Sequence, residues 1–310
     1  MKKYLTHYFV FIFLVYYSNV CCAQNDRHRY VILDDIEEDC VIKKYTLNTQ
    51  ELYGVDETIE MYNFMIMNSY TILISVFPDF YSDSNWTEID VDAIKNKITS
   101  KDNSWNRFCS QTLASEDVSD KKDWGFKLVK KHQDKWYASN VTLFELFVLR
   151  NWPHHFSPPF WYLNMGQEPI TMRTTKDSIF QRKPFLNNIA FPLYGSSGYY
   201  TGFPSELKKH YLTAKFEMEN ETFYKFWSLN HWNIVDGYNV HRGIDRLVYS
   251  NELGVVAGSF DFYFVNSSFS FDHRKRRNAN NKTVQELMEN ALNEKVMWAE
   301  ELKHLKPSGM

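Results

Sequence analysis

The residues best suited to chemistry lie in one polar stretch, residues 231–245, which reads HWNIVDGYNVHRGID. His231, Asp236 and His241 follow one another at intervals of five residues. Because residues at odd spacing on a strand face opposite sides, these side chains converge only if the chain turns at Asp236-Gly237. With that turn, two imidazoles and a carboxylate could bind zinc or supply acid–base catalysis. The alternative is a polar hairpin with Asp-Gly at its tip and ordinary surface histidines.

A second candidate site is aromatic and lies in the turn-rich middle of the chain. Trp and Tyr rings stack on sugars or line apolar pockets while keeping one polar group for hydrogen bonding. The run GSSGYYTG at 195–202 is typical of a loop, and loops lie at the surface. Packing of the same rings in the core is the alternative. The residues expected to form a ligand platform are Trp152, Phe160, Trp161, Tyr162, Tyr194, Tyr199 and Tyr200.

Familiar catalytic signatures do not occur in the sequence. It contains no Gly-x-Ser-x-Gly elbow, no HExxH, no Walker A loop and no Gly-x-Gly-x-x-Gly. Triads assembled from distant positions need no such motif, so an enzyme is still possible. We expect a non-enzymatic binding protein whose partner is a small ligand, a glycan or an extracellular protein. The alternative is a secreted hydrolase that uses the histidine site, and the sequence indicates no particular cofactor.

The N-terminus has the three parts of a secretory signal. Lys2-Lys3 precedes an apolar and aromatic run over residues 8–17, and small residues at 21 and 23 fit a cut before Gln24. The run is too short for a membrane-spanning helix, which needs about 20 residues. Loss of Lys2 and Lys3 changes the formal charge from −3 to −5, so the mature chain has no general attraction to nucleic acid. We expect a secreted protein without a membrane span.

An oxidising compartment changes how the cysteines and asparagines are interpreted. Cys40 and Cys109 are the two cysteines left after signal cleavage, and we expect them to form one disulfide. Two buried thiols are the alternative. Asn-x-Ser/Thr sequons become candidates for glycosylation in the same compartment. They are Asn85, Asn140, Asn220, Asn266 and Asn281.

A basic run near the C-terminus consists of Arg274, Lys275, Arg276 and Arg277. In a chain delivered to the secretory lumen it is not a nuclear address. It resembles the cleavage pattern of furin-type convertases, and a cut after Arg277 would release residues 278–310. The main alternative is an uncut, solvated basic loop, with binding of a polyanion as a weaker third interpretation.

These residues have to be positioned by a strand-rich scaffold. Residues 59–77 indicate two central strands around Asn68-Ser69, apolar on both faces. Further hairpins are expected over 124–138 and 211–229, and a strand over 255–265, where phenylalanines alternate with other residues. The run 141–149 fits either a buried strand or a short helix.

Helix signals are fewer. Residues 90–99 could form a helix with Asp90 as its cap, and 283–305 a longer one that starts with a Thr283/Glu286 capping box. The sequence therefore predicts a mainly β or α+β fold, an antiparallel sheet or sandwich of several hairpins with few helices and a C-terminal amphipathic helix. The expected division is a signal peptide (1–23), one strand-rich extracellular domain (24–273), and a basic loop with the C-terminal helix (274–310).

Overall fold

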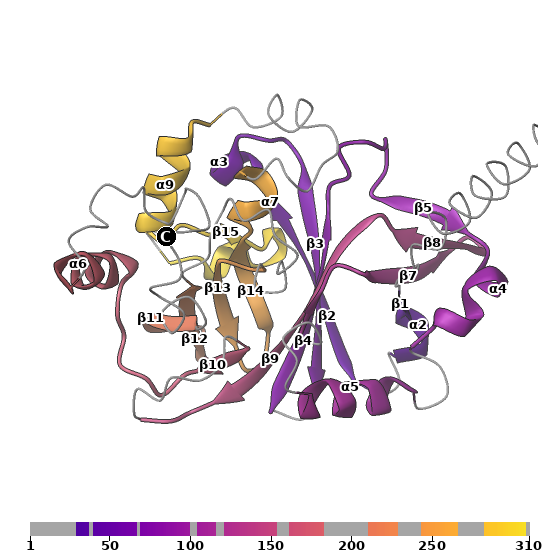
Figure 1. Cartoon of the computed structure of the whole chain (residues 1–310), viewed down its shortest axis with the longest axis horizontal. Helices are drawn as coiled ribbons and strands as arrows, with labels where there is room; N and C mark the ends of the chain where they lie inside the picture. The colour runs from indigo at the N-terminus through magenta and orange to yellow at the C-terminus, as the bar shows by residue number, and fades with distance from the viewer. Residues whose placement is uncertain are drawn as a thin grey trace, which may run out of the picture.

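The expected strand-rich, mainly antiparallel fold is confirmed by the computed structural model, whose described residues form three β-sheets and a few short helices (Figure 1). The described strands pair in antiparallel fashion except in two cases: β1 (Arg29–Ile32) with β7 (Phe126–His132), and β9 (Val141–Arg150) with β10 (Tyr162–Asn164). The structure describes residues 29–36, 40–66, 69–99, 104–115, 121–153, 161–182, 210–228, 243–265 and 282–307.

The central sheet has the strand order β10-β9-β4-β3-β2, with the short β6 also paired to β9. The expected hairpin is β3 and β4, with Ile66 opposite Tyr70. The run that fitted either a strand or a helix is a strand, β9, and its eight inner residues are all buried. The strands are β2 (Val41–Asn48), β3 (Thr58–Ile66), β4 (Tyr70–Phe77), β6 (Lys122–Asp123), β9 (Val141–Arg150) and β10 (Tyr162–Asn164).

The other two sheets contain the two remaining predicted hairpins. In the outer sheet, of order β1-β7-β8-β5, the turn residues Gln133 and Asp134 have positive φ. In the C-terminal sheet, of order β11-β12-β13-β14-β15, the turn residues Glu219 and Asn220 also have positive φ. Two consecutive positive φ values characterise the tight turn that matches strand twist. The outer strands are β1 (Arg29–Ile32), β5 (Trp86–Ile89), β7 (Phe126–His132) and β8 (Lys135–Ser139); the C-terminal ones are β11 (His210–Met218), β12 (Glu221–Ser228), β13 (Arg246–Ser250), β14 (Gly254–Ser259) and β15 (Met297–Trp298).

Two hydrophobic cores lie on the two faces of the central sheet. Ile59, Met61 and Leu73 belong to the core shared with the C-terminal sheet. Phe64 and Ile72 belong to the core shared with β1, β7 and α5 (Ser104–Ala114). Figure 1 shows the central sheet between the other two, with α5 below it and α9 (Val284–Leu292) beside α3 (Gln50–Tyr53). The prediction that strands 59–77 are buried on both sides is therefore confirmed.

The helices are short. Asp90 caps α4 as expected, because its carboxylate accepts the amide of Asp92 at 3.0 Å. The helices are α2 (Leu33–Ile36), α3 (Gln50–Tyr53), α4 (Val91–Ile94), η1 (Lys95–Lys97), α5 (Ser104–Ala114), α6 (Met172–Arg182), α7 (Asp261–Val265), α9 (Val284–Leu292) and η8 (Glu300–Leu305).

The strand expected over 255–265 is wrong in its second half. β14 ends at Ser259 and the chain continues as α7. On a strand, alternating rings would leave one face polar, but Phe260, Phe262, Tyr263 and Phe264 are all buried. The helix gathers them into one aromatic cluster, and it places Asp261 where it can pair with a buried arginine of β13.

The single helix expected over 283–305 is also wrong. The capping box of Thr283 and Glu286 is present, but α9 ends at Leu292. Glu294 adopts a left-handed φ of 54°, its amide donates to the Ala291 carbonyl, and the Lys295 amide donates to that of Asn290. These two bonds close the helix end as a Schellman motif. The chain then adds β15 to the C-terminal sheet and continues into η8.

Candidate functional site

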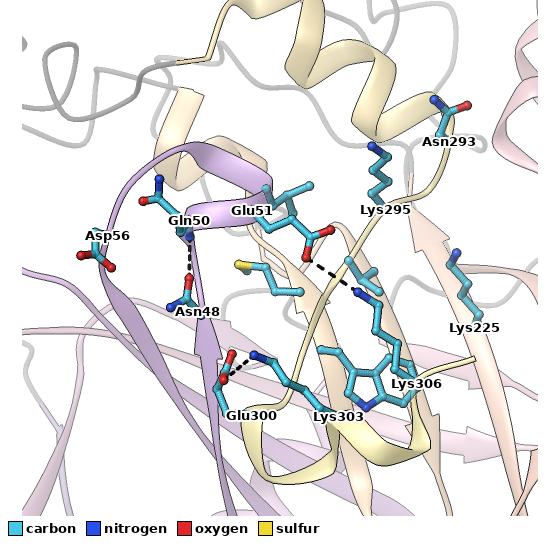
Figure 2. A pocket seen from close by; sticks show the side chains of 14 residues that line it. Asn48, Gln50, Glu51, Asp56, Lys225, Asn293, Lys295, Glu300, Lys303 and Lys306 are labelled. Atoms are coloured by element: carbon cyan, nitrogen blue, oxygen red, sulfur yellow. Dashed lines mark hydrogen bonds and ion pairs between the residues drawn. The ribbon is translucent and has the colours of Figure 1, made fainter. Parts of the chain in front are cut away.

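A cavity of about 930 Å³ opens where α9 ends, between α3, β12 and the segment that follows α9 (Figure 2). Two segments far apart in sequence make most of its wall: residues 48–56 and residues 293–306. β12 adds one residue, Lys225. The cavity is lined by four lysines, three carboxylates and an apolar part. Those charged residues are Lys225, Lys295, Lys303, Lys306, Glu51, Asp56 and Glu300.

The helix break after Leu292 creates this wall. Because Glu294 turns the chain, the residues after it run along the edge of β2 instead of continuing α9. Ala299 forms a bridge with Leu47, and the Glu301 carboxylate accepts the Thr46 amide at 3.0 Å. An unbroken helix would carry these residues away from the sheet, so the cavity depends on the Schellman turn.

Two of the lysines lie at the rim and are already paired. The Lys303 ammonium lies 2.6 Å from a Glu300 carboxylate oxygen, and that of Lys306 lies 3.7 Å from Glu51. Figure 2 shows both pairs as dashed contacts. Lys303 and Glu51 are solvent-exposed, so we expect each pair to contribute at most ~1 kcal/mol to stability. Lys295 is exposed as well. These residues give the rim its charge without fixing the fold.

Lys225 differs from the rim lysines because it is buried. It lies in the middle of the C-terminal sheet, opposite Ala214 on β11 and Val248 on β13, and only 8% of it is exposed. Within the part of the chain that the structure describes, no hydrogen-bond acceptor or carboxylate contacts its ammonium group. In Figure 2 it points toward the loop that carries Asn293 and Lys295.

Burial lowers the pKa of Lys225 below its ordinary value. The negative charge of Glu294 opposes this change, and the positive charge of Arg246 adds to it. The Glu294 carboxylate is engaged elsewhere, since it accepts the backbone amide of Met172 at 2.6 Å. The cavity therefore contains a buried amine whose charge is disfavoured by its surroundings.

Sequence reasoning missed Lys225, although one signal was available. Residues 223–227 read FYKFW, so the lysine occupies an aromatic strand between Phe223 and Trp227 on one face. A charged residue on a face that is otherwise aromatic marks a position where packing alone does not explain the side chain. The rim lysines carried no comparable signal, because isolated surface lysines are common.

The aromatic residues singled out from the sequence come together in part. The Trp152 and Tyr162 rings stack with centroids 5.9 Å apart, and those of Trp161 and Tyr162 lie 6.2 Å apart. The Arg150 guanidinium, which the sequence did not point to, lies 5.6 Å from the Trp152 ring centroid. Trp152 is 37% exposed. The other predicted members lie outside the described residues; they are Phe160, Tyr194, Tyr199 and Tyr200.

The predicted catalytic residues His231, Asp236 and His241 also lie outside the described residues. Where side chains are described, no three of His, Cys, Asp and Glu are arranged to bind a metal ion. The buried histidine of this part of the chain is His210, at the start of β11. Neither of its ring nitrogens has a hydrogen-bond partner, and burial together with the charge of Lys122 lowers its pKa well below the ordinary value.

The expected Cys40–Cys109 disulfide is not formed in the structure. The two residues nevertheless border the same core: Cys109 is buried on α5 and Cys40 packs against it from the residue before β2. Burial, and then the negative charge of the Cys40 thiolate, raise the pKa of the Cys109 thiol to about 12. The fold thus brings these cysteines to the same core, but without a disulfide between them.

Three of the five sequons can be placed. Asn220 is exposed at the tip of the β11–β12 turn. Asn140 is engaged, because its side-chain amide donates to Asp79 Oδ2 at 3.0 Å and to the Ser84 carbonyl at 2.8 Å. Asn85 accepts the Asp79 amide at 2.8 Å. Of these three, Asn220 is the most accessible. Asn266 and Asn281 lie outside the described residues.

The C-terminal segment is part of the folded body. Leu287, Ala291 and Trp298 belong to the core shared with the C-terminal sheet, and β15 pairs with β14. The basic run from Arg274 to Arg277 lies outside the described residues. A cut there would leave the segment held by this core and this pairing rather than release it.

No helix in the described ranges has the length and apolar character needed to cross a membrane. Family models, curated proteins and solved structures offer no match for this chain. The function therefore has to be inferred from the cavity and its lysines.

Proposed function

We propose that this chain is a secreted binding protein that holds a small anionic ligand in the lysine-lined cavity. The observation that carries this proposal is Lys225, a residue that is only 8% exposed, that lines the cavity, and whose ammonium has no partner among the described residues. A buried ion without compensation costs several kcal/mol. A ligand anion would supply the missing charge and hydrogen-bond acceptors.

The rest of the cavity supports a small organic anion. Its volume of about 930 Å³ falls in the ordinary range for small-molecule sites. Trp298, Val296 and Leu52 provide an apolar wall for the uncharged part of such a ligand. Lys295 adds a second positive charge near the mouth. Four lysines against three carboxylates leave the lining with an excess of one positive charge.

Titration calorimetry with inorganic phosphate, against chloride at the same ionic strength, tests this proposal. Lys225→Met removes the charge and keeps the length of the side chain. We expect it to weaken phosphate binding about ten- to hundredfold, the effect of losing one charged hydrogen bond of ~1.5–3 kcal/mol. The matched control is Lys215→Met, an exposed lysine on the neighbouring strand β11. Equal phosphate affinity in the wild type and Lys225→Met would overturn the proposal.

The aromatic cluster favours a second candidate, a site for a glycan or another ring-shaped ligand. Trp152 offers a partly exposed ring, supported beneath by Tyr162 and by the Arg150 guanidinium. Sugars stack on such rings through their C–H faces. Monosaccharide titrations followed by tryptophan fluorescence would test it, with Trp152→Ala expected to abolish the response and Trp136→Ala, on β8, to retain it. A response that survives Trp152→Ala would exclude this cluster.

The proposal includes the secretory route. After signal cleavage the chain would be one extracellular domain, glycosylated at Asn220, with Cys40 and Cys109 joined by oxidation. Expression of the full chain in a eukaryotic secretory host tests all three points by mass spectrometry. We expect a mature N-terminus at Gln24, a glycan lost in Asn220→Gln, and two hydrogens fewer than in the reduced protein. Retention in the cytosol would contradict the route.

A further inference from the structure

Lys225 has two physical ways to relieve its uncompensated charge. It can meet an anion, or it can lose its proton and become a neutral amine. The second way is favoured by its neighbours on the sheet. Trp227 lies opposite Arg246 in the β12–β13 register, so Lys225, two residues earlier, is on the same face as that guanidinium. A nearby cation and a desolvated position both favour the neutral form of a lysine.

A neutral lysine amine in a cavity is a nucleophile toward carbonyl carbon. Burial and the charge of Arg246 lower the pKa of Lys225, so its neutral fraction near pH 7 is larger than that of an exposed lysine. The charge of Glu294 opposes this lowering, but its carboxylate accepts the backbone amide of Met172 in α6. The rim lysines Lys303 and Lys306 are paired with carboxylates.

We infer that Lys225 captures a small anionic ligand that also carries an aldehyde or ketone group, and joins it as an imine. The inference rests on the proposed function, because the anionic group is what brings this ligand into the cavity. The charged form of Lys225 attracts that group first; after Lys225 loses its proton, the group pairs with Lys295 while the carbonyl carbon meets the neutral amine. The cavity volume, about 930 Å³, leaves room for both ends of such a molecule.

The bond changes balance without an oxidant or a reductant. The lone pair of the neutral Lys225 Nζ attacks the carbonyl carbon and forms a C–N bond, giving a carbinolamine. The two nitrogen protons and the former carbonyl oxygen then leave as one water molecule, and a C=N bond remains. The product no longer needs a charge at this position, so imine formation removes the desolvation cost of the ammonium.

Pyridoxal 5′-phosphate is a suitable probe because it has both an aldehyde and a phosphate. The full secreted chain is incubated with it near pH 7, the imine is fixed with borohydride, and the modified lysine is located by peptide mass spectrometry. We expect Lys225 to be labelled at least tenfold more than the exposed Lys215. Inorganic phosphate should suppress the labelling, since it holds the ammonium in its charged form. Pyridoxal, which lacks the phosphate, should label Lys225 more weakly.

Two variants separate chemistry from folding. Lys225→Arg keeps the positive charge but has no nucleophilic amine, so we expect it to bind phosphate and to give no specific label. Lys225→Met should lose both, and its thermal unfolding shows whether it is folded. Labelling spread evenly over exposed lysines, or unchanged in Lys225→Arg, would overturn the inference. Phosphate binding without Lys225 labelling would overturn the inference and leave the proposed function standing; absence of both would overturn both.

Discussion

Arg246 on β13 and Lys225 on β12 are buried on the same face of the C-terminal sheet, but their charges have different surroundings. Arg246 is 1% exposed, and its guanidinium contacts both oxygens of Asp261, at 2.5 and 2.8 Å. It also donates to the Lys295 carbonyl at 2.8 Å. Burial opposes its charge, but Asp261 outweighs that effect and raises the pKa of Arg246 above the ordinary value. Lys225 has no such partner within the described ranges.

The network around Arg246 continues into the core. The Tyr53 hydroxyl donates to Asp261 at 3.0 Å, and Asp245 accepts the Asp261 amide at 2.6 Å. The same rule holds on the central sheet, where the Lys122 ammonium lies 2.9 Å from the Glu145 carboxylate and both are buried. A buried charge that is fully satisfied by the protein is structural. Lys225 departs from that pattern and faces a cavity, which is why its charge points to a ligand.

The largest expected effect comes from breaking the satisfied cation. Arg246→Met leaves Asp261 and Asp245 buried without their positive partner. We expect a loss of about 3–5 kcal/mol in the free energy of unfolding, measured by urea denaturation. Lys303→Met serves as the control, because its exposed pair with Glu300 contributes little. An Arg246→Met variant as stable as the control would show that Arg246 does not stabilise the fold, and so does not differ from Lys225 in this respect.

His210 is a buried group without hydrogen-bond partners, and protonating it should destabilise the fold. Its pKa is lowered in the fold, so the unfolded chain binds more protons below pH ~6.5. The free energy of unfolding should therefore fall by about 1.4 kcal/mol for each pH unit below ~6.5. The fall should level off once the pH is below the folded-state pKa of His210. His210→Phe should flatten this slope, since a phenyl ring can keep the contact with Phe147. An unchanged slope in that variant would show that other groups cause it.

Lys225→Met should leave the ligand-free protein as stable as the wild type or stabilise it by about 1 kcal/mol, because it removes an uncompensated charge. The pH dependence has a defined sign. With a lowered pKa in the fold, Lys225 holds fewer protons than in the unfolded chain, so wild-type stability rises with pH up to the ordinary value of about 10.5. The variant should lack that rise. Strong destabilisation by Lys225→Met would mean that the lysine is structural after all.

The smallest effect is expected from Glu294→Gln. The amide oxygen can still accept the Met172 amide, so α6 keeps its contact, but the negative charge near Lys225 disappears. Phosphate affinity should rise by a few-fold, equivalent to less than ~1 kcal/mol. Calorimetry at constant ionic strength measures it, and Glu289→Gln, on the exposed side of α9, is the control. Weaker phosphate binding in Glu294→Gln would argue that this carboxylate helps to hold the ligand.

Local features of the fold were predictable because they depend on neighbouring residues. The strands around residues 67–69 and the turns at Gln133-Asp134 and Glu219-Asn220 follow from apolar runs and turn positions. The Thr283/Glu286 capping box formed as its spacing indicates. The two errors have one cause. Ring alternation through residues 260–264 and the apolar stripe through 283–305 satisfy a local pattern, while the partners that decide the conformation lie elsewhere in the chain.

The sequence by itself determined the strand-rich fold, the central hairpin buried on both sides, and the start of α9, because side-chain periodicity and capping act over a few residues. Only the tertiary structure decided that α9 ends at Leu292 and that the chain turns at Glu294, whose carboxylate accepts the Met172 amide. It also decided that residues 48–56 and 293–306 form a cavity beside Lys225. Whether a buried charge is satisfied depends on residues brought together from distant segments. That difference between Arg246 and Lys225 exists only in the folded chain.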